Sequence, residues 1–261
     1  MHMHKCAVLV LALGLILGAC ATNGKTETKP VTAEKDNASD KKEEPMVWPN
    51  ALKEEGALSA KDFEARVVVA GGAVDFVFED DRPFAQCHAS TIAQASDGTM
   101  IAAWFAGTKE KDPDVGIWMS RRLDGKWLPP YLAAKVEPCA HWNPVLFTDA
   151  EGAVHLFFKV GPEIPHWKTW WMSSGDHGAT WSQPRELVPG DAGGRGPVKN
   201  KPIILSDGSW LAPASTEFNL WEAFADRSTD RGVTWVRSED FEIDRSVFKG
   251  KGAIQPTFWE S

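Results

Sequence analysis

Residue types that can move a proton recur in this sequence just before or between short apolar runs. His88 and His141 each precede such a run, and Asp114 lies in a loop between two others. An imidazole gives or takes a proton near neutral pH, and a carboxylate can act as its partner. We therefore predict acid–base chemistry with His88, His141 and Asp114 as the catalytic residues. The alternatives are packed structural histidines and a simple turn acid at Asp114.

A second group of polar side chains occupies comparable positions and suits ligand binding. Lysine and arginine neutralise a carboxylate, while amides and carboxyl groups hydrogen-bond hydroxyl groups. The expected substrate-binding residues are Asn143, Arg195, Lys199, Asn200, Lys201, Glu217 and Gln255.

Cys87 and Cys139 precede two of the same apolar runs. We expect these cysteines either to form a disulfide or to remain as two buried thiols, because their spacing alone cannot decide between the two. The sequence offers no compact Cys/His spacing for a metal, so we expect neither a metal nor another cofactor.

An internal repeat positions these residues. Residues 174–181 and 228–235 share the pattern S-x-D-x-G-x-T-W, 54 residues apart, and a degenerate copy at 120–127 ends 54 residues earlier. A second marker keeps nearly the same spacing in Asp97-Gly98, Glu151-Gly152 and Asp207-Gly208. Such periodicity is typical of stacked supersecondary units.

Each repeat predicts short antiparallel strands separated by turns. The expected strands are residues 90–95, 100–105 and 116–120, then 144–148, 154–159 and 169–173, then 202–205, 210–215 and 222–228. With an exit strand per unit, this predicts an all-β protein, a β-propeller of four-stranded blades that bury the 13 Trp and 13 Phe. Residues 82–261 hold about 3.3 units of 54 residues, so we expect three to four blades of a larger propeller.

Up-and-down topology predicts which face carries the chemistry. The starts of the first strands and the loops between second and third strands share one face, opposite the Asp-Gly turns and the repeated boxes. All the candidate residues except Arg195 lie at these starts or loops, so we expect them to converge on one pocket.

The repeated pattern resembles the Asp-box of sialidases and related BNR-repeat propellers, which have six blades. This resemblance implies that the boxes are structural and that an acid–base aspartate lies in the first such loop, at Asp114 or Asp112. The chain departs from the pattern where His88 replaces an arginine at the first strand start. Tyr131 does not match the position of the family's tyrosine nucleophile.

The segments H-A-S-T, A-W-F-A-G-T and H-W-N-P-V-L-F also resemble the sialidase-like subgroup. The implied function is a carbohydrate-active enzyme that removes a terminal acidic sugar from a glycan, as an exo-sialidase does. The alternative is an exo-lyase acting by β-elimination at a rhamnosyl-glucuronate end, with the two histidines as acid and base. A second alternative is a propeller that binds a glycan without catalysis.

The N-terminus predicts export. Residues 1–19 resemble a bacterial lipoprotein signal peptide, and the motif Leu-Gly-Ala before Cys20 makes Cys20 the expected lipidation site. Residues 20–48 are polar and predict a disordered tether before a propeller domain at 49–261. We expect a cell-envelope protein held to the outer membrane by its lipid, facing the periplasm or the surface. A net charge of −8 argues against nucleic acid as a partner.

Overall fold

The computed structural model describes residues 7–10 and 73–261. The predicted lipidation site at Cys20 and the tether lie outside the described residues, and both stay predictions. β1 (Ala7–Val10) and β2 (Ala73–Phe76) form a two-stranded sheet. Residues 74–261 belong to one compact unit, which carries all of the propeller repeats.

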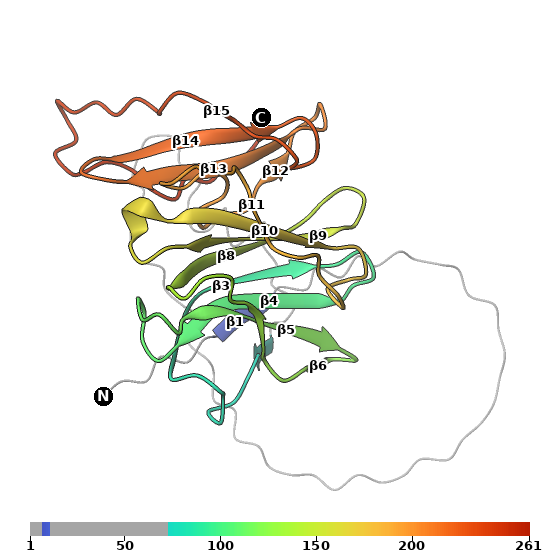
Figure 1. Ribbon diagram of the computed structural model, residues 1–261. Coiled ribbons are helices and arrows are strands. Elements are labelled where there is room, and N and C mark those ends of the chain that lie inside the picture. The colour runs from blue at the N-terminus through green and yellow to red at the C-terminus, as the bar shows by residue number, and fades with distance from the viewer. Residues whose placement is uncertain (1–6, 11–72) are drawn as a thin grey trace, which may run out of the picture. The chain divides into compact units, whose positions relative to one another are not determined.

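Three antiparallel sheets follow in chain order, and Figure 1 shows them as successive layers coloured green, yellow and orange. The first contains β3 (Gln86–Gln94), β4 (Met100–Gly107), β5 (Gly116–Leu123), β6 (Lys126–Trp127) and β7 (Tyr131–Ala134). The second contains β8 (His141–Thr148), β9 (Val154–Val160), β10 (Lys168–Ser174) and β11 (Arg185–Glu186), with the 3-10 turn η1 (Ile164–His166) before β10. The third contains β12 (Ile203–Ile204), β13 (Trp210–Glu217), β14 (Trp221–Ser228) and β15 (Val236–Arg237).

The predicted all-β propeller blades are confirmed, with two differences in detail. β3 and β8 begin several residues earlier than predicted, at Gln86 and His141, because their first residues also pair with β4 and β9. The predicted exit strand of the first blade is split, since β6 and β7 both pair with β5. No α-helix occurs in the described part of the chain.

Two aromatic layers hold the blades together. β9 is buried along its whole length, and successive side chains of a strand point to opposite faces. Phe158 therefore joins the layer between the first and second blades, which includes Trp142. Phe157 joins the layer between the second and third blades, with Trp210 and Trp235. The tryptophan of a box thus contributes directly to the core.

The hydrogen bonds of the Asp-boxes give them a structural role. Ser174 Oγ accepts the Gly178 N–H at 2.8 Å, and both oxygens of Asp176 accept hydrogen bonds from Thr180, at 2.8 and 2.6 Å. The box at residues 228–235 repeats the same contacts. The threonine hydroxyl, the largest contribution, lowers the pKa of each box aspartate to about 2.

The boxes also join neighbouring blades. His177 Nδ1 lies 3.7 Å from the carboxylate of Asp97, in the Asp-Gly turn of the preceding blade. One repeat later, Arg231 pairs with Glu151 at 3.2 Å in the corresponding turn. The residue after each box aspartate therefore contacts the acidic residue of the previous blade.

Candidate functional site

Strand pairing assigns the predicted site residues to one face of the blades. Gln86 at the start of β3 pairs with Gly107 at the end of β4. His141 at the start of β8 likewise pairs with Val160 at the end of β9. The boxes and Asp-Gly turns follow the other strand ends, so the strand-start face lies opposite them. This face is called the site face below.

The first strands of the blades are distorted at the same point on this face. β3 shifts its pairing between His88 and Thr91, and β8 does so between Trp142 and Val145. In each bulge two residues oppose one residue of the neighbouring strand. Ala89 and Asn143 consequently have positive φ angles of 55° and 39°, and Gln255, at the equivalent position of the fourth unit, has 53°. β-Bulges redirect side chains and are frequent beside active sites.

His88 lies exposed at the first bulge beside a carboxylate. Its side chain is 70% exposed, and Nδ1 lies 3.4 Å from Glu110 Oε2 in the loop between β4 and β5. The edge of the ring packs against Phe105, with centroids 5.5 Å apart. A carboxylate on one imidazole nitrogen orients the ring and leaves the other nitrogen for a ligand.

Asp114 lies at the other end of the same loop and is held as an anion. Its Oδ2 accepts hydrogen bonds from the hydroxyl and the N–H of Thr108, both at 2.8 Å. These two bonds, with a smaller contribution from Lys135, lower the pKa of Asp114. His88, Glu110 and Asp114 thus belong to one strand start and one loop of the first blade.

The third blade supplies cations and a second carboxyl group. Lys199 Nζ donates to the Ser90 carbonyl at 3.0 Å, and Lys201 Nζ donates to the Ile92 carbonyl. Both lysines therefore reach from the third blade to β3, the innermost strand of the first. Glu217 ends β13 on the site face, where burial raises its pKa.

The remaining amides on this face have different environments. Asn200 Nδ2 donates to the carbonyls of Gln255 and Pro256 at 2.8 and 2.9 Å, which fixes the next strand start. The backbone N–H of Gln255 donates to Ser215 Oγ at 3.2 Å. Asn143 is half-buried at the second bulge. The backbone conformation thus sets the positions of Asn143 and Gln255. The side-chain amide of Asn200, in contrast, is already used in hydrogen bonds to the protein's own backbone.

The structure places His141 where it cannot serve as the predicted catalytic residue. Its side chain is buried, Nδ1 donates to the Cys139 carbonyl at 3.0 Å, and Nε2 accepts the Val136 N–H at 2.9 Å. Burial lowers the pKa of His141 to about 4, so the ring is neutral. Because both nitrogens are engaged with backbone, we remove His141 from the catalytic set.

Arg195 is also removed from the predicted binding set. Its guanidinium forms a two-pronged pair with the fully buried Asp226, with contacts of 2.7 to 3.1 Å, and also donates to the Trp235 carbonyl at 2.9 Å. The buried ammonium of Lys159 donates to the Arg195 carbonyl at 2.8 Å and to Thr169. Arg195 therefore compensates a buried charge between the second and third blades.

Cys87 and Cys139 do not form a disulfide in this structure. Burial is the main cause that raises the pKa of Cys139, whose Sγ lies 3.8 Å from Glu137 Oε2. Across residues 7–10 and 73–261, no group of three or more His, Cys, Asp or Glu has an arrangement suited to a metal. In the same residues no helix has the length and apolarity needed to cross a bilayer.

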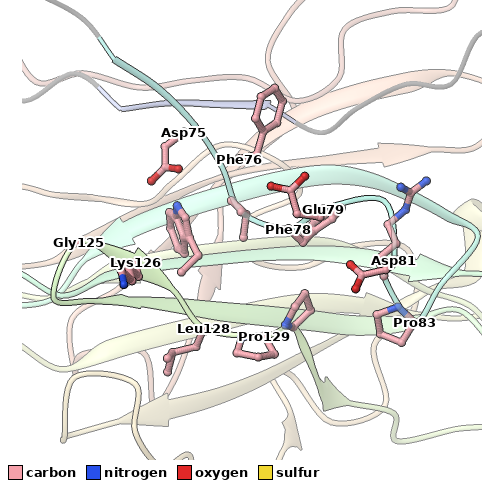
Figure 2. A pocket seen from close by; sticks show the side chains of 14 residues that line it. Asp75, Phe76, Phe78, Glu79, Asp81, Pro83, Gly125, Lys126, Leu128 and Pro129 are labelled. Carbon is pink, nitrogen blue, oxygen red and sulfur yellow. The ribbon is translucent and has the colours of Figure 1, made fainter.

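A cavity of about 570 Å³ lies away from the site face. It opens between residues 75–83 and the hairpin that joins β5 to β6, as Figure 2 shows, and it contains none of the predicted site residues. Glu79 and Asp81 lie on one side of the cavity and Lys126 on the other. We therefore do not assign the catalytic site to this cavity.

Sequence reasoning missed Glu110 and Lys135, which contact the candidate catalytic residues. Glu110 lay within a predicted site loop, but nothing in the local sequence singles it out from Lys109 or Asp112. Lys135 follows the end of a strand, and its contacts appear only once the loop at 107–115 is folded against it. Lys159 did carry a signal, since it is the lone Lys, Arg, Asp or Glu in a strand that is buried along its whole length, whereas Asp226 shares its strand with Glu222 and Arg227.

Solved structures share this fold at low sequence identity. A protein of unknown function from Dyadobacter fermentans is 16% identical, with a TM-score of 0.51 over 60% of this chain and 55% of its own. The Hadza microbial sialidase Hz136 is 16% identical, with a TM-score of 0.53 over 66% of this chain and 42% of its own. The leech intramolecular trans-sialidase is 13% identical, with a TM-score of 0.50 over 69% of this chain and 47% of its own.

The chain thus spans about half the length of these structures, and at such identities the likeness shows the fold alone. No curated protein matches the sequence. A family model described as a BNR repeat-like domain matches residues 98–261, which include both Asp-boxes and most of the site face. The chain belongs to the BNR repeat-like domain family.

Proposed function

We propose that this chain carries part of the active site of an exo-acting glycosidase of the sialidase superfamily, which removes a terminal acidic sugar from a glycan. The observation that carries the proposal is the pairing of His88 with Glu110 at the first bulge of the site face, with Asp114 held by Thr108 in the same loop as Glu110. Strained backbone beside titratable groups is a frequent mark of active sites. The sialidase-type fold supports the same chemistry.

Asp114 and His88 suit opposite roles in hydrolysis, the first as a base and the second as an acid. Asp114 is kept ionised by Thr108, so it can accept a proton from an attacking water. His88, oriented by Glu110, gives a proton to the glycosidic oxygen as its bond to the anomeric carbon breaks. The water oxygen bonds to that carbon, and its proton passes to Asp114. Each proton and each electron pair is thereby accounted for.

Cations of the third blade give the proposed preference for an acidic sugar. Lys199 and Lys201 extend toward the innermost strand of the first blade, where an ammonium group would face the sugar carboxylate. Glu217, whose pKa is raised by burial, offers a carboxyl group to the sugar hydroxyls.

One observation favours β-elimination as the second candidate. The single tyrosine of this sequence, Tyr131, lies in β7, and its hydroxyl donates to Met119 Sδ at 3.2 Å rather than lying on the site face. Among the described residues there is thus no tyrosine nucleophile on the site face, and elimination does not require one. A base removes the proton beside the carboxylate, its electrons form the C4–C5 double bond, and an acid protonates the departing oxygen.

The test is a product assay on the full chain with a sialylated trisaccharide and with a rhamnosyl-glucuronate oligosaccharide. Hydrolysis of the first releases free sialic acid, whereas elimination of the second gives an ultraviolet-absorbing product. His88→Gln and Asp114→Asn should each lower kcat/KM by about 10²–10⁴-fold. Asp112→Asn, two residues away in the same loop, is the matched control and should keep the activity.

Saturable glycan binding without product would instead support a non-catalytic propeller. Turnover that is unchanged in both His88→Gln and Asp114→Asn would overturn the residue assignment. If Asp112→Asn were inactive while Asp114→Asn stayed active, the acidic role would move to Asp112.

A further inference from the structure

We infer that Lys135 is a positioning residue that fixes the location of Asp114. The role in turnover rests on the proposed function, whereas the location and the pKa of Asp114 can be measured without it. Lys135 directly follows β7 and belongs to the connection that leads to β8. It contacts the loop of the first blade on one side and the start of the second blade on the other.

The ammonium group of Lys135 uses all three of its protons on backbone carbonyls. Nζ donates to Pro113 O at 2.5 Å, to Val115 O at 2.9 Å and to Cys139 O at 2.7 Å. Pro113 and Val115 are the two neighbours of Asp114 in the chain. Because the carbonyls on both sides of Asp114 bind one cation, the backbone of Asp114 has little freedom to move.

The connection that carries Lys135 is itself fixed to the second blade. The His141 N–H donates to the Val115 carbonyl at 3.1 Å, and its ring bonds both the Val136 N–H and the Cys139 carbonyl. His141 therefore holds the segment against which Lys135 binds the loop. This assigns to His141 a supporting role in place of the predicted catalytic one.

The same contact places a positive charge beside the Asp114 carboxylate. Asp114 is faced by Thr108 and Lys135, and both lower its pKa. Lys135 is faced by Asp114, by the Cys139 thiol with its neighbour Glu137, and by the neutral His141 ring. Loss of the cation removes a favourable charge from Asp114, takes the donor from the Pro113 carbonyl, and leaves the Val115 and Cys139 carbonyls with their His141 donors alone.

The experiment uses the full chain and a readout that does not need activity. In Lys135→Met, the pKa of Asp114, followed by carboxyl-carbon NMR and assigned with Asp114→Asn, should rise, because the cation is lost while the two Thr108 bonds that lower it most remain. Amide hydrogen exchange at Thr108 and His141 should become faster. Lys126→Met, on the far side of the first blade, should change neither.

Kinetics then test the role in turnover. With Asp114 as the base, kcat should fall about 10- to 100-fold in Lys135→Met while KM changes much less. The acid limb of the kcat/KM profile should move to higher pH by the same amount as the pKa. Lys135→Gln keeps donors without the charge, so it should raise the pKa with less effect on hydrogen exchange, and it serves if Lys135→Met does not fold.

An unchanged Asp114 pKa in folded Lys135→Met or Lys135→Gln overturns the inference. A shifted pKa in a protein that turns over no glycan overturns the proposed function and leaves the positioning role standing. A shifted pKa with an unchanged kcat overturns the link between Lys135 and turnover.

Discussion

The box face and the site face use the same residue types in opposite ways. On the box face, both oxygens of Asp176 accept hydrogen bonds from Thr180 within one turn. On the site face, Asp114 accepts both of its bonds from Thr108 through Oδ2, and the residue is exposed. The repeat therefore keeps one end of each blade constant for folding and leaves carboxylate oxygens accessible at the other.

The side chains that reach other blades show the same division. His177 and Arg231 on the box face contact the acidic turn of the adjacent blade, one repeat away. Lys199 and Lys201 on the site face reach β3, two blades away. Contacts between adjacent blades stabilise the stack, whereas contacts across two blades bring distant strand starts together, as a shared pocket requires.

Among the variants that test this difference between the contacts, the largest loss of stability is expected when the buried Arg195–Asp226 pair is broken. Asp226→Ala leaves the Arg195 guanidinium without its carboxylate, so the free energy of unfolding should fall by about 3–5 kcal/mol, measured by urea unfolding. Asp240→Ala breaks the exposed pair with Arg237 and should cost under about 1 kcal/mol. If the two variants were equally stable, Arg195 would be available for substrate after all.

As the pH falls, His141 on the site face and the box aspartates should lose their contributions to stability in different pH ranges. His141 has a pKa of about 4 in the fold and 6.5 when unfolded, so its contribution is full above pH 6.5 and is lost as pH falls through 4. At 1.36 kcal/mol per unit, this loss is on the order of 3 kcal/mol. The box aspartates have pKa values lowered from 3.8 to about 2, so their contribution is lost only as pH falls through 2.

Substitutions of His141 and Asp176 distinguish the two pH ranges. His141→Gln should flatten the stability profile between pH 6.5 and 4 and keep the loss at lower pH. Asp176→Asn should reduce the lower loss and keep the upper one. Urea midpoints measured at half-unit pH steps provide the readout, and a single transition window shared by both variants would contradict the separation.

A smaller effect is expected from backbone geometry in the box. Gly178 has φ +79°, and a Cβ there would lie 2.5 Å from Ile101 Cδ1 in the preceding blade. Gly178→Ala should therefore lower the free energy of unfolding by about 1–3 kcal/mol. Gly175→Ala is the control, because no atom lies within 4 Å of its added Cβ. Thermal unfolding of the two variants gives the comparison, and equal melting temperatures would refute the steric argument.

Local pattern predicted the blades well because each strand and turn depends on neighbours in sequence. The boxes and Asp-Gly turns predicted correctly where strands end, whereas β3 and β8 begin earlier than predicted. Burial of His141 could not be predicted, because it depends on how residues 135–140 fold over the ring. The pairing of Arg195 with Asp226 spans 31 residues and has no local signature.

The bulges in β3 and β8 have a consequence for protein engineering. Because each inserts an extra residue, the inward and outward alternation of side chains changes phase at Ala89 and Asn143. A chimaera that transplants one blade's specificity into another must therefore carry the bulge together with its side chains. Without the bulge, the grafted side chains intended to contact a ligand would point to the opposite face of the blade. The recipient would then carry the new sequence without the geometry that its specificity requires.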